Sequence, residues 1–86
     1  MNGRIDYWSA TFCQPCHILK PKVIKLAAQH GFEFVEHDVE VELSQATTLH
    51  ILGVPTLFIQ ASDALFPAVV TSGMATIPQI KKAMGV

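Results

Sequence analysis

The chain has 86 residues, a formal net charge of -1 at pH 7, and hydrophobic side chains at 50% of its positions. This length allows one domain with a modest core, and the high apolar fraction excludes a disordered chain. No basic run is present, which argues against nucleic-acid binding, because a basic surface is needed to neutralise phosphates. The apolar runs are too short to cross a membrane. We therefore expect a single domain over residues 1–86, with no nucleic-acid or membrane partner.

The start of the chain lacks the positive charge and apolar stretch of a signal peptide, so we expect a cytoplasmic protein. Its two cysteines, Cys13 and Cys16, are three positions apart. In the cytosol, such a pair is more often catalytic or metal-binding than a structural cross-link. A bridge that closes so short a loop would also constrain the unfolded chain little. The pair is therefore the first candidate for a functional site.

Residues 4–8 are rich in β-forming side chains and predict the first strand. A helical pattern follows over residues 13–30, and Gly31 is its expected C-terminal stop. Pro15 suits the first turn of this helix, whereas Pro21 lies inside it and should kink it. The side chains expected on the buried face are Ile18, Leu19, Val23, Leu26 and Ala27.

The second half of the chain predicts two more helices and three more strands. Residues 32–38 alternate and predict a strand parallel to the first, because a helix connects the two. A shorter helix is expected over residues 42–51, ended by Gly53. The remaining elements are strands over residues 55–60 and 65–71, which form an antiparallel hairpin, and a last helix over residues 76–84. The order β-α-β-α-β-β-α implies an α/β fold with a four-stranded mixed sheet and three helices distributed over both faces.

A Cys-x-x-Cys pair at a strand–helix junction has a defined chemistry. Cys13 would cap the helix, so unpaired N–H groups and the positive end of the helix dipole point at its sulfur. Both favour the thiolate, which is the attacking species in disulfide exchange. Cys16 lies one turn deeper and could attack a mixed disulfide formed on Cys13. We therefore predict a nucleophile at Cys13 and a resolving thiol at Cys16, with Gln14 and Pro15 tuning the redox potential.

Two metal-binding interpretations compete with this one. Residues 13–17 also match the haem-attachment pattern C-x-x-C-H, with Met74 or Met84 as a second axial ligand. A haem protein of this size would be mostly helical, which the β-rich middle of the chain disfavours. A zinc site needs four ligands, or three and a water, and no second ligand pair accompanies the cysteines. We expect no metal and no cofactor, and we interpret the histidines as ordinary surface or end-of-element residues: His17, His30, His37 and His50.

Three motifs, in chain order, resemble the thioredoxin family. Residues 8–21 resemble its active-site segment, with an aromatic residue before the first cysteine, a dipeptide, the second cysteine and a later proline. Residues 53–56, Gly-Val-Pro-Thr, resemble the family's Gly-Ile-Pro-Thr, and residues 73–80 are similar to the glycine and final helix that close its active-site surface. The resemblance covers nearly the whole chain and implies a compact thioredoxin fold.

The resemblance also implies roles for residues outside the cysteine pair. Pro55 would be a cis-proline that borders Cys13, and the Val54 backbone would hydrogen-bond an extended substrate segment. The docking surface around the nucleophile corresponds here to Phe12, Leu52, Val54, Gly73 and Met74.

Thioredoxins place a buried aspartate beneath the active site as a proton relay. Asp6 is the candidate for this role, since Asp6-Tyr7-Trp8 resembles the family's Asp-aromatic-Trp run. An ungapped match nevertheless puts Tyr7 at that position. Glu36 falls where thioredoxins commonly have a lysine. The sequence leaves the choice between Asp6 and Tyr7 open.

These features predict a thiol–disulfide oxidoreductase, a thioredoxin-like electron donor that reduces protein disulfides. Ribonucleotide reductase is one candidate partner, because short donors of this superfamily serve it. A thioredoxin reductase or glutathione would restore the dithiol, and we expect a monomer. Two alternatives stay open: a glutaredoxin-like, glutathione-dependent enzyme, which the dipeptide Gln-Pro in place of Pro-Tyr disfavours, and a non-catalytic binding module with an idle cysteine pair.

Overall fold

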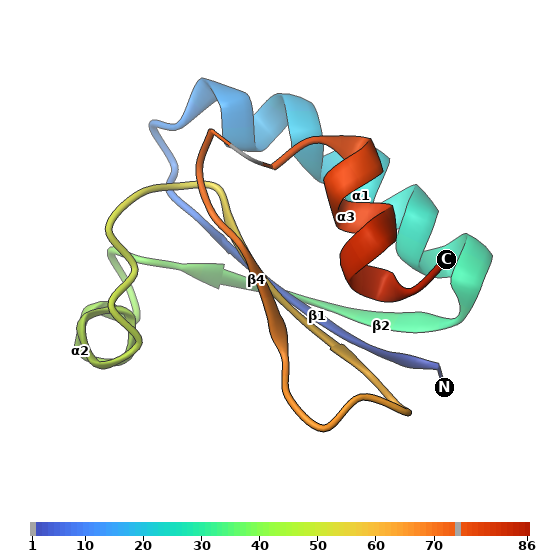
Figure 1. Ribbon diagram of the computed structural model, residues 1–86. Helices are drawn as coiled ribbons and strands as arrows, with labels where there is room; N and C mark the ends of the chain where they lie inside the picture. The colour runs from blue at the N-terminus through green and yellow to red at the C-terminus, as the bar shows by residue number, and fades with distance from the viewer. Residues whose placement is uncertain (1, 74) are drawn as a thin grey trace.

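The computed structural model describes residues 2–73 and 75–86. Strands and helices follow one another in the predicted order (Figure 1). Their bounds are β1 Gly3–Ser9, α1 Gln14–His30, β2 Phe32–Asp38, α2 Leu43–Thr48, β3 Thr56–Ala61, β4 Ala68–Val70 and α3 Ile77–Met84. Both chain ends lie at the end of the sheet away from the start of α1 (Figure 1).

The four strands form one mixed sheet in the order β2-β1-β3-β4. β1 pairs in parallel with β2, where Trp8 is opposite His37, and antiparallel with β3, where Trp8 is opposite Thr56. β3 and β4 form the expected antiparallel hairpin. The predicted α/β class and mixed sheet are confirmed. β1 is an inner strand, and its C-terminal end leads directly into the loop before Cys13.

The main core lies between the sheet and two of the helices. α1 and α3 lie on one face of the sheet, whereas α2 lies on the other side, near the end where β1 stops (Figure 1). The buried side chains of this core are Ile5, Tyr7, Val23, Leu26, Ala27, Phe32, Leu57, Ile59, Val70, Ile80 and Met84. The face opposite this core receives much less cover, because α2 has only six residues.

α1 has the predicted start and end. Cys13 is its N-cap, and Gly31 is its C-cap with a φ of 71°, a left-handed conformation that glycine adopts at low cost. Ile18 was expected on the buried face, but it is 56% exposed. The reason is that one helical step rotates its side chain by about 100° away from that of Leu19. No helix in the described part of the chain is long and apolar enough to cross a membrane.

Two predicted boundaries are wrong. α2 stops short of residue 51, because the chain turns back at His50, whose φ is 57°. The Ile51 N–H then donates to the Ala46 carbonyl at 3.0 Å, a bond that closes the helix before Gly53 is reached. β4 begins at Ala68 rather than residue 65, because Pro67 has no N–H to donate to a neighbouring strand.

Candidate active site

The two cysteines lie at the N-terminus of α1, where the loop from β1 enters the helix. They form a disulfide, and their Cα atoms are 5.3 Å apart. Cys13 is the N-cap residue, and its sulfur accepts a hydrogen bond of 3.2 Å from the Cys16 backbone N–H. Both residues are buried, but Cys13, at 6% exposed, is more accessible than Cys16, at 1%.

The first turn of α1 favours negative charge on the Cys13 sulfur. Gln14 and Pro15 are exposed there, and no acidic side chain lies in this turn. The Cys16 N–H already points at the sulfur, and the positive end of the helix dipole lies at the same place. In the reduced protein these groups stabilise a thiolate at Cys13 relative to the thiol.

The segment before β3 faces the disulfide from the other side. The Val54–Pro55 peptide bond is cis, and the Val54 carbonyl oxygen lies 3.8 Å from the Cys13 sulfur. Pro55 is buried, and the Thr56 hydroxyl donates to the Gly53 carbonyl at 2.6 Å, which ties this segment to the start of β3. Val54, which is 41 positions after Cys13 in the sequence, is thereby brought against it, as the resemblance implies.

An apolar cavity of about 370 Å³ adjoins the cysteine pair through Val39 and Val54, which line it and also pack against Cys13 and its neighbours. Three predicted docking residues share it: Phe12, Leu52 and Val54. Phe12 is 77% exposed and Leu52 is 97% exposed, so both are accessible to another molecule. Six further residues line the cavity and were not predicted as docking residues: Val39, Leu43, Ala46, Thr47, Ile51 and Gly53. Their only signal was the presence of apolar side chains at the ends of β2 and α2.

The remaining predicted docking residues are Gly73 and Met74, and Gly73 lies in the loop between β4 and α3. Gly73 has a φ of 87°, a conformation that favours glycine. Its neighbour Ser72 lies close to Gly53, where an added Cβ would come within 3.2 Å of the Ser72 Cβ. This loop therefore borders the segment that faces the disulfide. Met74, which was also expected to dock substrates, lies outside the described residues.

Tyr7 lies directly beneath the cysteine pair. Its side chain is fully buried, and its hydroxyl donates a 2.7 Å hydrogen bond to the Cys16 carbonyl. Burial, together with the negative charge of Glu36, raises the pKa of Tyr7 to about 12. The phenol is therefore neutral at physiological pH and acts as a hydrogen-bond donor to the first turn of α1. Glu36 itself forms an ion pair with Lys20 at 2.9 Å.

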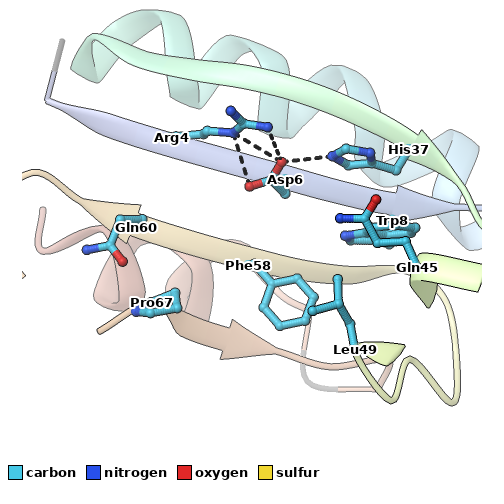
Figure 2. A pocket seen from close by; sticks show the side chains of 9 residues that line it. All are labelled: Arg4, Asp6, Trp8, His37, Gln45, Leu49, Phe58, Gln60 and Pro67. Carbon is cyan, nitrogen blue, oxygen red and sulfur yellow. Dashed lines mark hydrogen bonds and ion pairs between the residues drawn. The ribbon is translucent and has the colours of Figure 1, made fainter. Parts of the chain in front are cut away.

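Asp6 points away from the cysteines. Adjacent side chains on a strand alternate between faces, so Asp6 and Tyr7 lie on opposite sides of β1. The Asp6 carboxylate accepts a hydrogen bond from Arg4 Nη2 at 2.8 Å and pairs with His37 Nε2 at 2.8 Å (Figure 2). In the described part of the chain, no carboxylate is hydrogen-bonded to either cysteine. Asp6 therefore lies on the wrong face of β1 to relay a proton to or from Cys16.

Replacing Tyr7 with phenylalanine tests the hydrogen bond beneath the site. The variant keeps the ring in the core but leaves the Cys16 carbonyl without the phenolic donor. We expect the free energy of unfolding to fall by about 0.5–1.5 kcal/mol. Urea unfolding of the oxidised protein at pH 7 measures this change. A Tyr7→Phe variant as stable as the wild type would show that the bond contributes nothing to the fold.

His17 contacts the loop that precedes Cys13. Its Nε2 lies 2.7 Å from the Thr11 carbonyl oxygen, so the ring N–H ties the loop before Cys13 to α1. Outside Met1 and Met74, no three histidine, cysteine, aspartate or glutamate side chains gather closely enough to hold a metal ion. The haem interpretation assumed a mostly helical protein, whereas this chain folds around a four-stranded sheet.

Several solved structures with the same fold are thioredoxins. Thioredoxin 1 from Thermosipho africanus is 19% identical, with a TM-score of 0.83 over 95% of this chain and 90% of its own. A mutant thioredoxin from Halobacterium salinarum is 26% identical, with a TM-score of 0.80 over 96% of this chain and 72% of its own. Mitochondrial thioredoxin 3 from Saccharomyces cerevisiae is 21% identical, with a TM-score of 0.81 over 98% of this chain and 77% of its own.

One of two sequence comparisons also identifies the family. No curated protein sequence matches the chain significantly. The family model named Thioredoxin, however, matches residues 4–85, nearly the whole chain, including the cysteine pair and the Gly-Val-Pro-Thr segment. The chain therefore belongs to the thioredoxin family of thiol–disulfide oxidoreductases.

Proposed function

We propose that this protein is a thioredoxin-like electron donor that reduces disulfide bonds in other proteins. The observation that carries the proposal is the position of the Cys13 sulfur. It lies at the cap of α1, 3.8 Å from the Val54 carbonyl and beside an exposed apolar cavity. A substrate disulfide can therefore approach an activated thiolate along a surface suited to a peptide chain.

The reaction consists of two thiol–disulfide exchanges. The Cys13 thiolate attacks one sulfur of the substrate disulfide, and the other substrate sulfur leaves as a thiolate. The Cys16 thiolate then attacks the Cys13 sulfur, which breaks the mixed disulfide and releases the second substrate thiolate. Two electrons pass from the dithiol to the substrate, and the Cys13–Cys16 disulfide remains. A reductase or a low-molecular-weight thiol then restores the dithiol.

The substrate class follows from the surface beside Cys13. Phe12 and Leu52 present apolar side chains there, and Val54 offers its backbone to an extended segment. Protein disulfides flanked by apolar residues fit this surface better than small charged disulfides do. Ribonucleotide reductase is one candidate substrate. The proposal also includes electron transport by a monomer in the cytosol, as part of cellular redox homeostasis.

The proposal is tested by following NADPH consumption with insulin as the disulfide substrate. One arm contains a thioredoxin reductase, and the other contains glutathione with glutathione reductase. We expect at least about tenfold faster turnover in the first arm, a difference of about 1.4 kcal/mol in activation free energy. The Cys13→Ser variant gives the background in both arms.

Two other outcomes would contradict the proposal. Faster turnover in the glutathione arm would favour a glutaredoxin-like enzyme. If dithiothreitol-driven insulin reduction proceeds at the same rate with wild type and with Cys13→Ser, the cysteine pair is idle and the fold serves as a binding module.

A further inference from the structure

His37 lies at the end of β2 on the sheet face that α1 and α3 leave open. Its Nε2 is 2.8 Å from Asp6 Oδ1, and its Nδ1 is 3.0 Å from both carboxylate oxygens of Glu42. The Trp8 ring stacks on the imidazole, with centroids 4.4 Å apart. Figure 2 shows His37 next to Asp6 and Trp8, on the wall of a pocket that is lined by side chains of β1, β2 and β3 and by Gln45 of α2.

A doubly protonated ring satisfies both of these contacts. A neutral imidazole has one N–H and can donate to only one of the two carboxylates, whereas the imidazolium donates to both. The groups that face His37 are Asp6 and its partner Arg4 on β1, Glu42 before α2, and the uncharged Trp8. Burial lowers the pKa of His37, but the hydrogen bonds to Asp6 and Glu42 outweigh it and raise the pKa above its ordinary value.

Besides the His37–Glu42 contact, α2 is anchored mainly by the buried Ala46 and by the backbone N–H groups of Val41 and Glu42, which donate to the Asp38 carbonyl at the end of β2. It has six residues and buries only Ala46, and a helix this short is not stable on its own. Glu42 is its N-cap residue but makes no side-chain hydrogen bond to the helix backbone. Its carboxylate binds His37 instead. The His37–Glu42 contact therefore ties the start of α2 to the sheet.

The same helix forms a wall of the cavity beside Cys13. Leu43, Ala46 and Thr47 line this cavity together with Leu52 and Val54. The Ile51 N–H donates to the Ala46 carbonyl, so the segment that leads to Val54 is attached to α2. A movement of α2 therefore changes the shape of the cavity and the position of the segment that faces the nucleophile.

We propose that His37 is a positioning residue for substrate docking, whose imidazolium form holds α2 against the sheet and whose deprotonation loosens the cavity beside Cys13. This inference rests on the proposed function. His37 touches neither cysteine, so it affects the binding of protein substrates and leaves the exchange chemistry unchanged. Because the fold raises its pKa, its ion pairs stabilise the fold fully below the ordinary histidine pKa of about 6.5. That stabilisation is lost as pH rises through the folded-state value.

The first test is an NMR titration of the oxidised protein, in which neither cysteine titrates. We expect the amide signals of α2 and of residues 49–54 to shift with the same midpoint as the His37 ring. The Glu42→Gln variant should lower that midpoint, since it removes one of the two carboxylates. The matched control, Glu40→Gln, removes an exposed charge nearby without touching His37 and should leave the midpoint unchanged. Amides that do not follow the His37 ring, or a midpoint unaffected by Glu42→Gln, would overturn the inference.

The second test separates docking from chemistry. At pH 7, Glu42→Gln should raise the KM for insulin by about fivefold, the lower end of typical coupling between sites. Its kcat/KM for a small aromatic disulfide should match that of Glu40→Gln. An equal loss on both substrates would overturn the positioning role. The NMR titration does not depend on catalysis. A failure of the proposed oxidoreductase function would be recognised separately, because a Cys13→Ser variant would then reduce insulin as fast as the wild type.

Discussion

Replacing Cys13 with serine is expected to reduce protein-disulfide reduction by at least about a thousandfold, as losses of catalytic nucleophiles do. The serine hydroxyl is not ionised at neutral pH, and an oxygen at this position cannot form the mixed disulfide. The helix cap and the apolar cavity remain, so the variant should still bind a substrate protein. Insulin reduction with dithiothreitol measures the loss.

Replacing Cys16 with serine should have a different effect. The Cys13 thiolate still attacks, but no second thiol resolves the product, so a covalent mixed disulfide with the substrate accumulates. Mass spectrometry after incubation with an oxidised substrate protein detects it, and dithiothreitol should release it. If Cys13→Ser traps the substrate and Cys16→Ser does not, the two roles are reversed.

Replacing Leu57 with alanine should lower the free energy of unfolding by about 2–5 kcal/mol. Leu57 lies in β3, an inner strand, and its side chain is fully buried in the core between the sheet and the two covering helices. The substitution removes apolar contacts and leaves a cavity that packed neighbours cannot fill. Because small domains have total stabilities of about 5–15 kcal/mol, this loss is a large part of the whole.

Leu52→Ala is the matched control, since it deletes the same atoms from a side chain that is almost fully exposed. Its unfolding free energy should stay within about 0.5 kcal/mol of the wild type, whereas its KM for insulin should rise. Urea denaturation of the two oxidised variants gives the comparison. Similar stability losses in both variants would contradict the assignment of Leu57 to the core and of Leu52 to the docking surface.

Much of the fold was predictable because its signals are local. The alternation in residues 32–38 and the helical spacing that ends at Gly31 gave bounds close to those observed. The errors lie where a local signal was absent. Nothing in the sequence marks His50 as a left-handed residue, so α2 was predicted too long. The start of β4 is the exception, because Pro67 is a local signal: its missing N–H limits the strand to Ala68–Val70.

The site was predictable to the extent that it depends on motifs. The cysteine pair and the segment around Val54 carry recognisable patterns, and Phe12 and Leu52 do share a cavity. Tyr7 could have been preferred over Asp6 from the alternation along β1, because the buried Ile5 and Tyr7 share a face. His37 was misjudged as an ordinary histidine, since its contact with Asp6 spans 31 positions and depends on the register between two strands.

The alternation of side chains along β1 has a consequence for how such a protein can be modified. Tyr7 supports the cysteine pair from one face of the strand, and Asp6 and Trp8 on the other face contact His37 in the polar cluster that anchors α2. One face of β1 thus supports the cysteine pair, and on our proposal the other face supports the cavity that docks substrate proteins. Substitutions at alternate positions of β1 should change one property while largely preserving the other, so an engineer could vary each separately.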